Sequence, residues 1–506
     1  MKILSAQQIR QLDKYTIAKE RIASINLMER AAAKFTDQLI SFVNSDSDIS
    51  IFCGLGNNGG DGLAVARQLL ARGYTNISVF VVMHGKNKSP DFEINESRLK
   101  ESLPITYISN SKQIPRLKTG TVIIDALFGS GLNRRVEGIA AEVISAINKS
   151  KAKVISIDVP SGLFCDKLND PNDTIVKSTL TLTFHAPKFS FLLAANGKYV
   201  PKFRVLDIGL SKANADKMDS TNYLIDDNFI YGLLKPRSKF SHKGTYGHAL
   251  IIAGGYGKIG AAVLSVKAAL RSGAGLVTSV LPQCGYEIMQ LSNPEAMVVT
   301  SGENELGEIL GLDKFSAIGI GPGIGTEKDV VGFFQNLLKA SRAPMVLDAD
   351  ALNILSEYKS LLKLLPGNSI LTPHPGEFKR LVGDWIDDME KLKKQVAFSK
   401  KYKVVVVLKG ANTSVSSATG QLYFNSTGNA GMAKGGSGDV LTGIITSLLA
   451  QKYTPLHAAL LGVYVHGLAG DLAREEFGYT AMNASDIIAA LPAAFKQLET
   501  ETDFSA

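Results

Sequence analysis

Residues 49–73 read ISIFCGLGNNGGDGLAVARQLLARG, which is a short apolar run, a glycine-rich loop and then a helical pattern. The same order recurs where TVIID (121–125) leads into ALFGSGLNR and a helix near AAEVISAIN, and where KVISID (153–158) ends in VPSG. Further strands are expected at 77–83, 179–184 and 203–209. This alternation predicts a parallel sheet with helices on both faces.

A polar, turn-rich stretch, SKANADKMDS (211–220), follows, and the alternation then restarts. Strands are expected in this second half at 248–255, 276–282, 315–321, 343–350, 369–375, 403–410 and, shorter, 422–425. The fold class is therefore α/β, with a Rossmann-like three-layer domain at 1–215 and a larger α/β domain at 225–500. In such sheets ligands bind beyond the carboxyl ends of the strands, where the glycines and acidic residues of this chain fall.

Composition excludes several classes of protein. The 506 residues carry a net charge of +8, but the lysines are spread out, so we expect no nucleic-acid partner. None of the three cysteines lies in a C-x-x-C pair, which predicts neither a zinc site nor disulfides and suits the reducing cytoplasm. No apolar stretch resembles a signal peptide or a membrane span, so no membrane partner is expected.

The loop Gly54–Gly62 offers backbone N–H groups and a helix end to an anion. A tight strand-to-helix turn is the alternative, although such a turn does not need Asn57, Asn58 and Asp61. Two aspartates, Asp125 and Asp158, end later strands and could be helix caps. With Ser161 and Asn58, Asp125 could instead supply the hard oxygen ligands that suit potassium.

The motifs GNNGGDG, DALFGSGLNR and SIDVPSG, in that order, resemble the NAD(P)H-hydrate epimerase family over about residues 1–215. The resemblance implies potassium ligands at Asn58, Asp125 and Ser161. It implies substrate contacts at Asn57, Asn58, Gly59, Gly60, Asp61, Gly129, Ser130, Gly131, Leu132, Asn133, Arg134, Arg135 and Asp158. Inversion at C6 of a hydrated nicotinamide needs proton transfer, and Asp158 is the candidate acid/base.

The strongest motif of the second half is NAGMAKGGSGD (429–439), which precedes a long apolar helix. Its glycines bring backbone N–H groups together at a helix N-terminus, which forms an anion hole. Asp439 lies at the mouth of that hole, where a carboxylate can accept the proton of a hydroxyl that attacks phosphorus. A cap is the alternative role for Asp439, but it does not explain the preceding Gly-Gly-Ser-Gly.

This motif resembles the glycine-rich element of ribokinase-like phosphotransferases. Six ordered motifs narrow the resemblance to the ADP/ATP-dependent NAD(P)H-hydrate dehydratase family over about residues 225–500: GHALIIAGG, KAALRSGAGLV, GIGPGIG, LDADALN, LTPHPGEFKRL and VVLKGANT. The larger domain is therefore expected to be ribokinase-like.

The resemblance implies nucleotide contacts at Lys409, Gly410, Ala411, Asn412, Thr413, Asn429, Ala430, Gly431, Met432, Ala433, Lys434, Gly435, Gly436, Ser437 and Gly438. It implies contacts to the hydrated nicotinamide at Ala261, Gly323, His374, Pro375, Gly376, Glu377, Phe378, Lys379, Arg380 and Asp439. Asp348 and Asp350 remain open between magnesium binding and a role in the fold. His185 and His466 are expected to satisfy local packing.

Together the resemblances predict a bifunctional repair enzyme for hydrated NADH and NADPH. The first domain would epimerise C6, and the second, with Asp439 as catalytic residue, would dehydrate the S epimer by using ADP or ATP with Mg²⁺. A small-molecule kinase fused to a non-catalytic scaffold is the alternative, since the first domain also resembles one in mRNA-decapping scaffold proteins. The preferred nucleotide and coenzyme stay open, and a homo-oligomer is expected.

Overall fold

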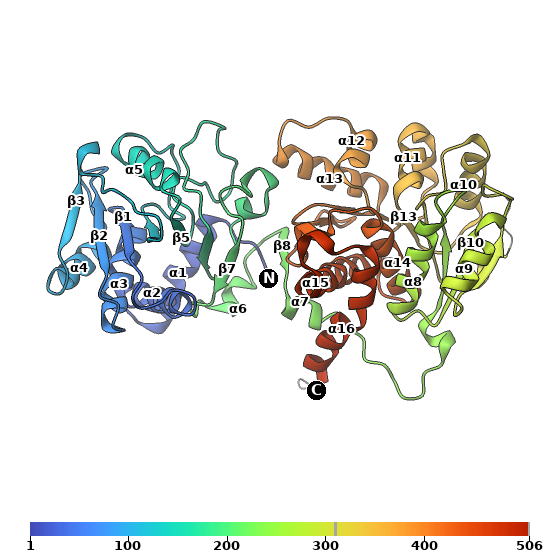
Figure 1. Cartoon of the computed structure of the whole chain (residues 1–506), viewed down its shortest axis with the longest axis horizontal. Coiled ribbons are helices and arrows are strands. Elements are labelled where there is room, and N and C mark those ends of the chain that lie inside the picture. Colours follow the sequence, from blue (N-terminus) through green and yellow to red (C-terminus); the bar gives the residue numbers. More distant parts are fainter. Residues whose placement is uncertain (308–310, 504–506) are drawn as a thin grey trace. The chain divides into compact units, whose positions relative to one another are not determined.

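The computed structural model describes residues 1–307 and 311–503, and the chain forms two compact units. Residues 2–220 form the smaller unit, and residues 221–506 together with Met1 form the larger one. Figure 1 shows the smaller unit in blue to green and the larger one in green to red. Each unit has its own sheet, so each is described by itself.

The smaller unit contains a seven-stranded, wholly parallel sheet in the order β3-β2-β1-β4-β5-β6-β7. Its strands are β1 (Ile49–Cys53), β2 (Ile77–Val82), β3 (Ile105–Ile108), β4 (Val122–Ala126), β5 (Lys153–Ile157), β6 (Leu180–Phe184) and β7 (Phe203–Leu206). Its helices are α1 (Ala6–Glu20), α2 (Ser24–Ile40), α3 (Asn57–Ala71), α4 (Pro90–Lys100), α5 (Gly138–Lys149) and α6 (Lys212–Ala215).

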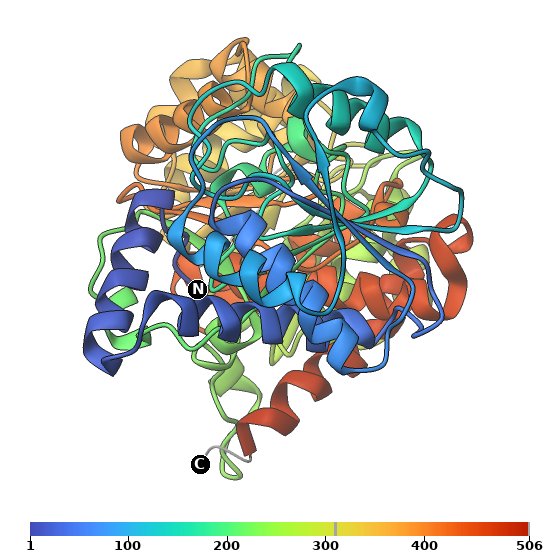
Figure 2. The ribbon, with the colours of Figure 1, turned by 90° about the vertical axis from the view of Figure 1, so that its left-hand side faces the viewer.

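Helices cover both faces of this sheet, as the alternation predicted. In Figures 1 and 2, α5 lies on the opposite side of the sheet from α2 and α3. Alternate residues of β1 supply the two cores: Ile51 packs in the cluster that includes α2 and α3, and Phe52 packs in the cluster that includes α5.

The glycine-rich segment is the first part of a helix, because α3 begins at Asn57. The expectation that the helix starts only after Gly62 was therefore wrong. Close packing explains the glycines in the first turns of α3. A Cβ at Gly59 would lie 1.9 Å from the carbonyl oxygen of Gly54, and one at Gly62 would lie 2.6 Å from Cβ of Ala126. The helix can approach β1 and β4 this closely only without side chains there.

The larger unit contains a ten-stranded sheet in the order β11-β10-β9-β12-β13-β14-β15-β16-β17-β8. Its strands are β8 (Asn222–Ile225), β9 (His248–Ile252), β10 (Leu276–Leu281), β11 (Met297–Thr300), β12 (Ala317–Ile320), β13 (Met345–Leu347), β14 (Ile370–Leu371), β15 (Val405–Leu408), β16 (Ser414–Ser416) and β17 (Leu422–Asn425). Its helices are α7 (Asp227–Tyr231), α8 (Ile259–Arg271), α9 (Tyr286–Ser292), α10 (Lys328–Ala340), α11 (Ala349–Glu357), α12 (Pro375–Val382), α13 (Asp388–Tyr402), α14 (Ser437–Ala450), α15 (Pro455–Ala481) and α16 (Ala484–Asp503).

This sheet is parallel from β11 to β15, and β16 pairs antiparallel with both β15 and β17. The alternation did not predict β3, β8, β11 or β16, which have at most four residues each. Several predicted strands are also shorter than expected. The segment 369–375 forms a strand only at Ile370–Leu371, because α12 begins at Pro375.

Helices α14 and α15 form the centre of the larger core. Nearly every residue of α14 after its first turn is buried, and α15 packs against α14 and α16. Among the described residues, α15 alone is long and apolar enough to cross a membrane, with 72% of its apolar window buried in the structure. A helix buried to that extent is accounted for as a core helix.

Candidate active sites

The first site forms where Asp158 follows β5. Its backbone is left-handed (φ 61°), which is uncommon for a residue other than glycine and is often found at functional sites. The carboxylate oxygen Oδ1 lies 2.7 Å from Nζ of Lys188 and accepts hydrogen bonds from Thr183 Oγ1 and Phe184 N, both at 3.1 Å. Asp158 is thus held in one orientation by three donors.

Lys188 is 1% exposed, and sequence reasoning missed it. Its ammonium group also donates to the carbonyl oxygens of Phe184 (3.2 Å) and Ala186 (3.3 Å). A lysine is almost never buried this fully unless it is paired. A buried lysine paired with an aspartate at a strand end is typical of a functional site. The only sequence signal for Lys188 was its position after β6.

Two further carboxylates interact with this pair. Burial, followed by the charges of Asp158 and Asp13, raises the pKa of Asp61 well above its usual value. Burial and then Asp158 raise the pKa of Asp13 to about 6, against a lowering effect of Lys188. Asp61 was a predicted contact, but Asp13 was missed because it lies on the polar helix α1 and not at a strand end. The site therefore contains groups that can carry a proton near neutral pH.

The three predicted potassium ligands converge on the segment after β4. Asp125 is fully buried, and it accepts hydrogen bonds from Ser161 Oγ (2.5 Å), Ser161 N (2.9 Å) and Ser156 Oγ (2.8 Å). Ser161 Oγ also accepts from Phe128 N at 2.8 Å, and Asn58 Oδ1 lies 3.0 Å from where a Cβ on Gly129 would be. Within the described residues, the buried Asn58 Nδ2 has no hydrogen-bond partner.

The side-chain oxygens of Asn58, Asp125 and Ser161 are hard donors, which fit a hard monovalent cation. The remaining predicted contacts of this half, Gly129–Arg135, lie in the loop after β4. Arg135 is bound locally, at 3.4 Å from Asp173 and 2.9 Å from the carbonyl oxygen of Asn172.

The second site forms at the N-terminus of α14. Gly436 is its N-cap, with φ 89°, and Ser437, Gly438 and Asp439 form the first turn. The first N–H groups of a helix have no partner within the helix, so this turn presents donors to an anion. A Cβ at Gly438 would lie 3.3 Å from Nζ of Lys409 and 3.5 Å from Oδ2 of Asp348. The helix start therefore lies directly against a charged pair.

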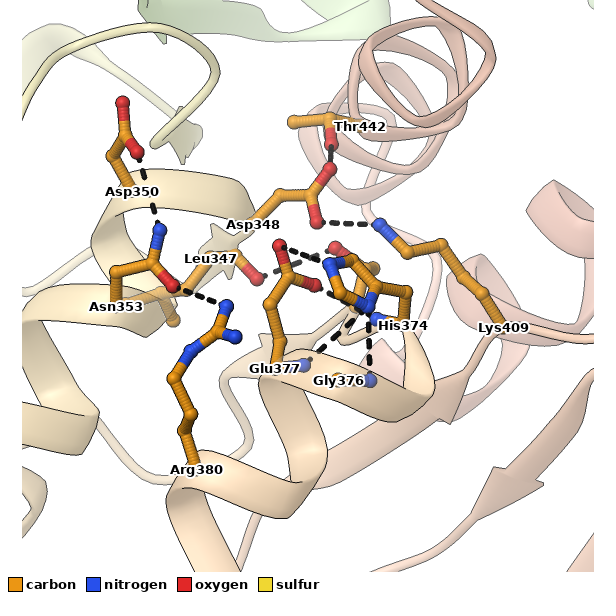
Figure 3. Close-up of polar contacts among 11 residues, drawn as sticks. Leu347, Asp348, Asp350, Asn353, His374, Gly376, Glu377, Arg380, Lys409 and Thr442 are labelled. Atoms are coloured by element: carbon orange, nitrogen blue, oxygen red, sulfur yellow. Dashed lines mark hydrogen bonds and ion pairs between the residues drawn. The ribbon is translucent and has the colours of Figure 1, made fainter. Parts of the chain in front are cut away.

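That pair is shown in Figure 3. Lys409 Nζ donates to Asp348 Oδ1 at 2.8 Å, and Thr442 Oγ1 of α14 donates to Asp348 Oδ2 at 2.9 Å. Asp348 is 1% exposed. Asp348 therefore holds the Lys409 ammonium and the start of α14 in place. Asp350 is held differently, by Gly325 N (2.9 Å) and Asn353 Nδ2 (3.2 Å).

Asp439 is the acidic residue of this site whose pKa is shifted. Burial, and then the charges of Asp348 and Asp350, raise its pKa to about 7, although Lys409 lowers it. His466 lies beside the same turn, with Nε2 at 3.3 Å from Ser437 Oγ, and burial followed by Lys409 lowers its pKa to about 4. A residue expected only to satisfy packing therefore borders the anion hole.

The segment His374–Arg380 opens α12 beside the pair. His374 is the N-cap, and its Nδ1 accepts from Gly376 N at 3.0 Å. Arg380 reaches Asn353 Oδ1 at 2.7 Å, and Lys379 pairs with Asp384. Phe378 is the exception among these predicted contacts, because it is buried in the core against Trp385 and Phe398.

Other predicted contacts surround the same edge of the sheet. Gly323 (φ 68°) lies so close to Ala261 that a Cβ on it would be 3.4 Å from that of Ala261. In the segment 409–413, Gly410 N donates to Thr413 Oγ1 at 3.3 Å and closes a turn. In the segment 429–438, Asn429 is anchored by Gly470 O and Asp471 Oδ1, both at 2.9 Å. Ala433, Lys434 and Gly435 are exposed.

A glycine-started helix lies beside the Lys409–Asp348 pair at the carboxyl ends of a mostly parallel sheet, which is the arrangement expected of a ribokinase-like α/β domain. The family model described as NAD(P)H-hydrate dehydratase matches residues 249–493 of this unit. The model described as YjeF-related protein N-terminus matches residues 24–190 of the smaller one.

The chain belongs to the family of bifunctional NAD(P)H-hydrate repair enzymes. It is 34% identical to the enzyme of that name from Moorella thermoacetica, over 99% of this chain and 98% of the relative. It is 35% identical to that from Coxiella burnetii, over 95% and 96%. It is also similar to the crystal structure of the ADP/ATP-dependent NAD(P)H-hydrate dehydratase from Bacillus subtilis, which was co-crystallized with ATP/Mg²⁺. The identity is 32%, the match covers 55% of this chain and 98% of that chain, and the TM-score is 0.48.

Proposed function

We propose that this protein restores NADH and NADPH from their hydrated forms. The smaller unit inverts C6 of the hydrated ring, and the larger unit dehydrates the S epimer with ADP or ATP as phosphoryl donor. The position of Asp439 in the first turn of α14, where the charges of Asp348 and Lys409 act on it, carries this conclusion for a chain that belongs to the repair family over its whole length.

Dehydration needs a good leaving group, which hydroxide is not. Asp439 accepts the proton of the C6 hydroxyl as the oxygen attacks the terminal phosphorus of the nucleotide. The N–H groups at the start of α14 and the ammonium of Lys409 stabilise the charge of the transferred phosphoryl group. The ring nitrogen then expels phosphate from C6, and loss of the C5 proton restores the dihydronicotinamide.

Mg²⁺ screens the phosphate charges when it is bound with the nucleotide. The described residues contain no group of three or more His, Cys, Asp or Glu that could hold a metal by themselves, which suits an ion bound mainly through phosphates. Asp350, with a side chain 19% exposed, is the carboxylate best placed to contact such an ion.

The smaller unit needs only an acid/base and charge stabilisation, because the hydrated carbon bears both nitrogen and hydroxyl. Asp158 moves the proton, and Lys188 holds its carboxylate in one orientation, with Nζ 2.7 Å from Oδ1. Asn58, Asp125 and Ser161 would hold K⁺, which supplies positive charge beside the substrate. The chiral site of the dehydratase takes only one epimer. An epimerase on the same chain converts the other epimer into that form, so that both can be recovered.

The pH dependence of dehydration follows from Asp439. Because the base acts in its ionised form and its pKa is raised to about 7, kcat/KM for the S epimer is expected to rise with pH through that value. Below it, the rate should fall by about tenfold per pH unit, since the ionised fraction falls by that factor. Steady-state rates measured from pH 5 to 9 test this expectation, and a flat profile across pH 6–8 would contradict it.

Removal of potassium is expected to slow the smaller unit alone. Exchange of the protein into a Na⁺ or tetramethylammonium buffer should reduce epimerisation, because neither cation suits a site of Asn58, Asp125 and Ser161 oxygens as K⁺ does. Dehydration of pure S epimer in the same buffers is the internal control. Equal epimerase rates in all three buffers would rule out the potassium site.

The assay that tests the proposed function uses the full-length protein with both epimers of hydrated NADH, Mg²⁺, and either ADP or ATP. The absorbance of the dihydronicotinamide should return completely with one or both nucleotides and not without them. A stable phosphorylated alcohol would instead support a small-molecule kinase. RNA binding without epimerase turnover would support the scaffold alternative for the smaller unit.

The proposal also concerns the donor nucleotide, the oligomeric state, the cellular compartment and the partners of the protein. ADP and ATP both stay open as the donor, and we expect a homo-oligomer. The three cysteines, which are all free in the structure, suit the cytoplasm, where NADH and NADPH occur. Small molecules are the expected partners, with no role for nucleic acid or a membrane.

A further inference from the structure

The proposed reaction needs a second proton acceptor. Asp439 becomes protonated when the hydroxyl attacks phosphorus, so it cannot also take the proton that leaves C5. The inference below rests on the proposed function and concerns this last step. A candidate base must be a buried, ionisable group of the same site.

Glu377 meets this description. Its carboxylate is 7% exposed, and within the described residues no lysine or arginine nitrogen lies within 4.0 Å of it. Oxygen Oε2 accepts one hydrogen bond, from the backbone N–H of His374 at 2.8 Å. Burial raises the pKa of Glu377 above its usual value, against the lowering effect of Lys409.

His374 presents a hydrogen-bond donor to the second oxygen. Its Nδ1 accepts from the backbone N–H groups of Gly376 (3.0 Å) and Glu377 (3.4 Å), so the proton of the neutral ring is on Nε2. Nε2 lies 3.4 Å from Glu377 Oε1, a distance too long for a strong hydrogen bond. Oε1 therefore has the weaker of the two contacts with His374, both of which Figure 3 marks with dashed lines.

The backbone holds Glu377 in the same site as Asp439. The strands β13, β14 and β15 are neighbours, and Asp348, His374 and Lys409 follow their carboxyl ends. Lys409 N donates to Pro373 O at 2.9 Å, which fixes the start of α12 beside Lys409. The Lys409 ammonium, which lies against Gly438, is the common neighbour whose charge acts on Glu377 and on Asp439.

We propose that Glu377 is the catalytic base that takes the C5 proton. After phosphate has left C6 with its bonding electrons, the ring nitrogen and C6 share a double bond. Glu377 Oε1 then forms a bond to the C5 proton, and the C5–H electron pair becomes the C5=C6 double bond. The nitrogen recovers its lone pair, so no oxidant or reductant is needed. His374, which is half-exposed, connects the carboxyl group to solvent.

The substitution Glu377→Gln separates this role from a structural one. Glutamine accepts the His374 N–H hydrogen bond in a capping box as glutamate does, but it is not a base. With pure S epimer and nucleotide, we expect a normal burst of phosphoryl transfer, measured by rapid quench, that is not followed by a matching restoration of NADH. Restoration of NADH should fall by about 10²- to 10⁴-fold.

Glu390→Gln is the matched control, because the Glu390 carboxylate accepts the backbone N–H of Ile386 at 2.7 Å at the start of α13. It should leave both steps unchanged. Wild-type restoration of NADH by Glu377→Gln would overturn the inference and would indicate that departing phosphate takes the proton. Loss of the burst together with restoration would also overturn it. Absence of a burst in the unmodified protein would instead refute the proposed function.

Discussion

Replacement of Asp439 by asparagine should lower the rate of NADH restoration from the S epimer by about 10²- to 10⁴-fold. The asparagine side chain has the same shape, but it cannot accept the hydroxyl proton. Nucleotide affinity should change little, because the glycine-rich turn and Lys409 remain. Stopped-flow absorbance of the dihydronicotinamide, with nucleotide binding measured by calorimetry, separates the two effects.

A matched control comes from another helix of the same unit. Asp486 lies in the first turn of α16, where its Oδ2 accepts the backbone N–H of Asn483 at 2.8 Å. Asp486→Asn should leave turnover unchanged, because this carboxylate bonds the backbone at the start of its own helix. Unaltered turnover in Asp439→Asn would show that Asp439 takes no part in the chemistry.

Replacement of Asp158 by asparagine should lower the rate of C6 inversion by a similar factor of about 10²–10⁴. The amide oxygen can still accept from Thr183 and Phe184, so the left-handed turn has its local partners. The Lys188 ammonium loses its carboxylate while it stays buried. Loss of one partner of a buried ion pair costs about 3–5 kcal/mol, so the free energy of unfolding of the smaller unit should also fall.

Two measurements distinguish lost chemistry from lost folding. Chromatographic separation of the R and S epimers gives the inversion rate, and dehydration of pure S epimer by the same variant reports on the larger unit. We expect an epimer mixture to be restored quickly only in its S fraction. Undiminished inversion would mean that another group, for which Asp61 and Asp13 are the nearest choices, carries the proton.

The fold class and most buried strands were predictable because apolar runs that end in glycine or aspartate mark parallel strands. The error at the start of α3 has a clear reason. Glycines usually indicate a loop, whereas Gly59 and Gly62 are needed inside a helix that packs against β1 and β4. The strand β16 was missed because SVS is too short to show a period, and its antiparallel pairing depends on contacts with β15 and β17.

In the candidate sites, too, residues whose positions depend on distant parts of the chain could not be predicted from the sequence. Strand-end residues such as Asp158 and Asp348 could be singled out, because topology brings strand ends together. Lys188 and Asp13 could not, since their roles depend on a loop and a helix that fold back onto the end of β5. Phe378 shows a further limit: the resemblance assigns it a substrate contact, which stays a prediction, while the structure shows its side chain in the core.

Isotopic oxygen tests most directly whether the C6 hydroxyl attacks phosphorus. The S epimer of hydrated NADH would be prepared with ¹⁸O in its C6 hydroxyl and mixed with excess protein, Mg²⁺ and nucleotide in ordinary water. If the hydroxyl oxygen leaves as part of phosphate, the inorganic phosphate released should contain one ¹⁸O atom per NADH restored. Unlabelled phosphate, with the label recovered in water, would contradict phosphoryl transfer and the role of Asp439 with it.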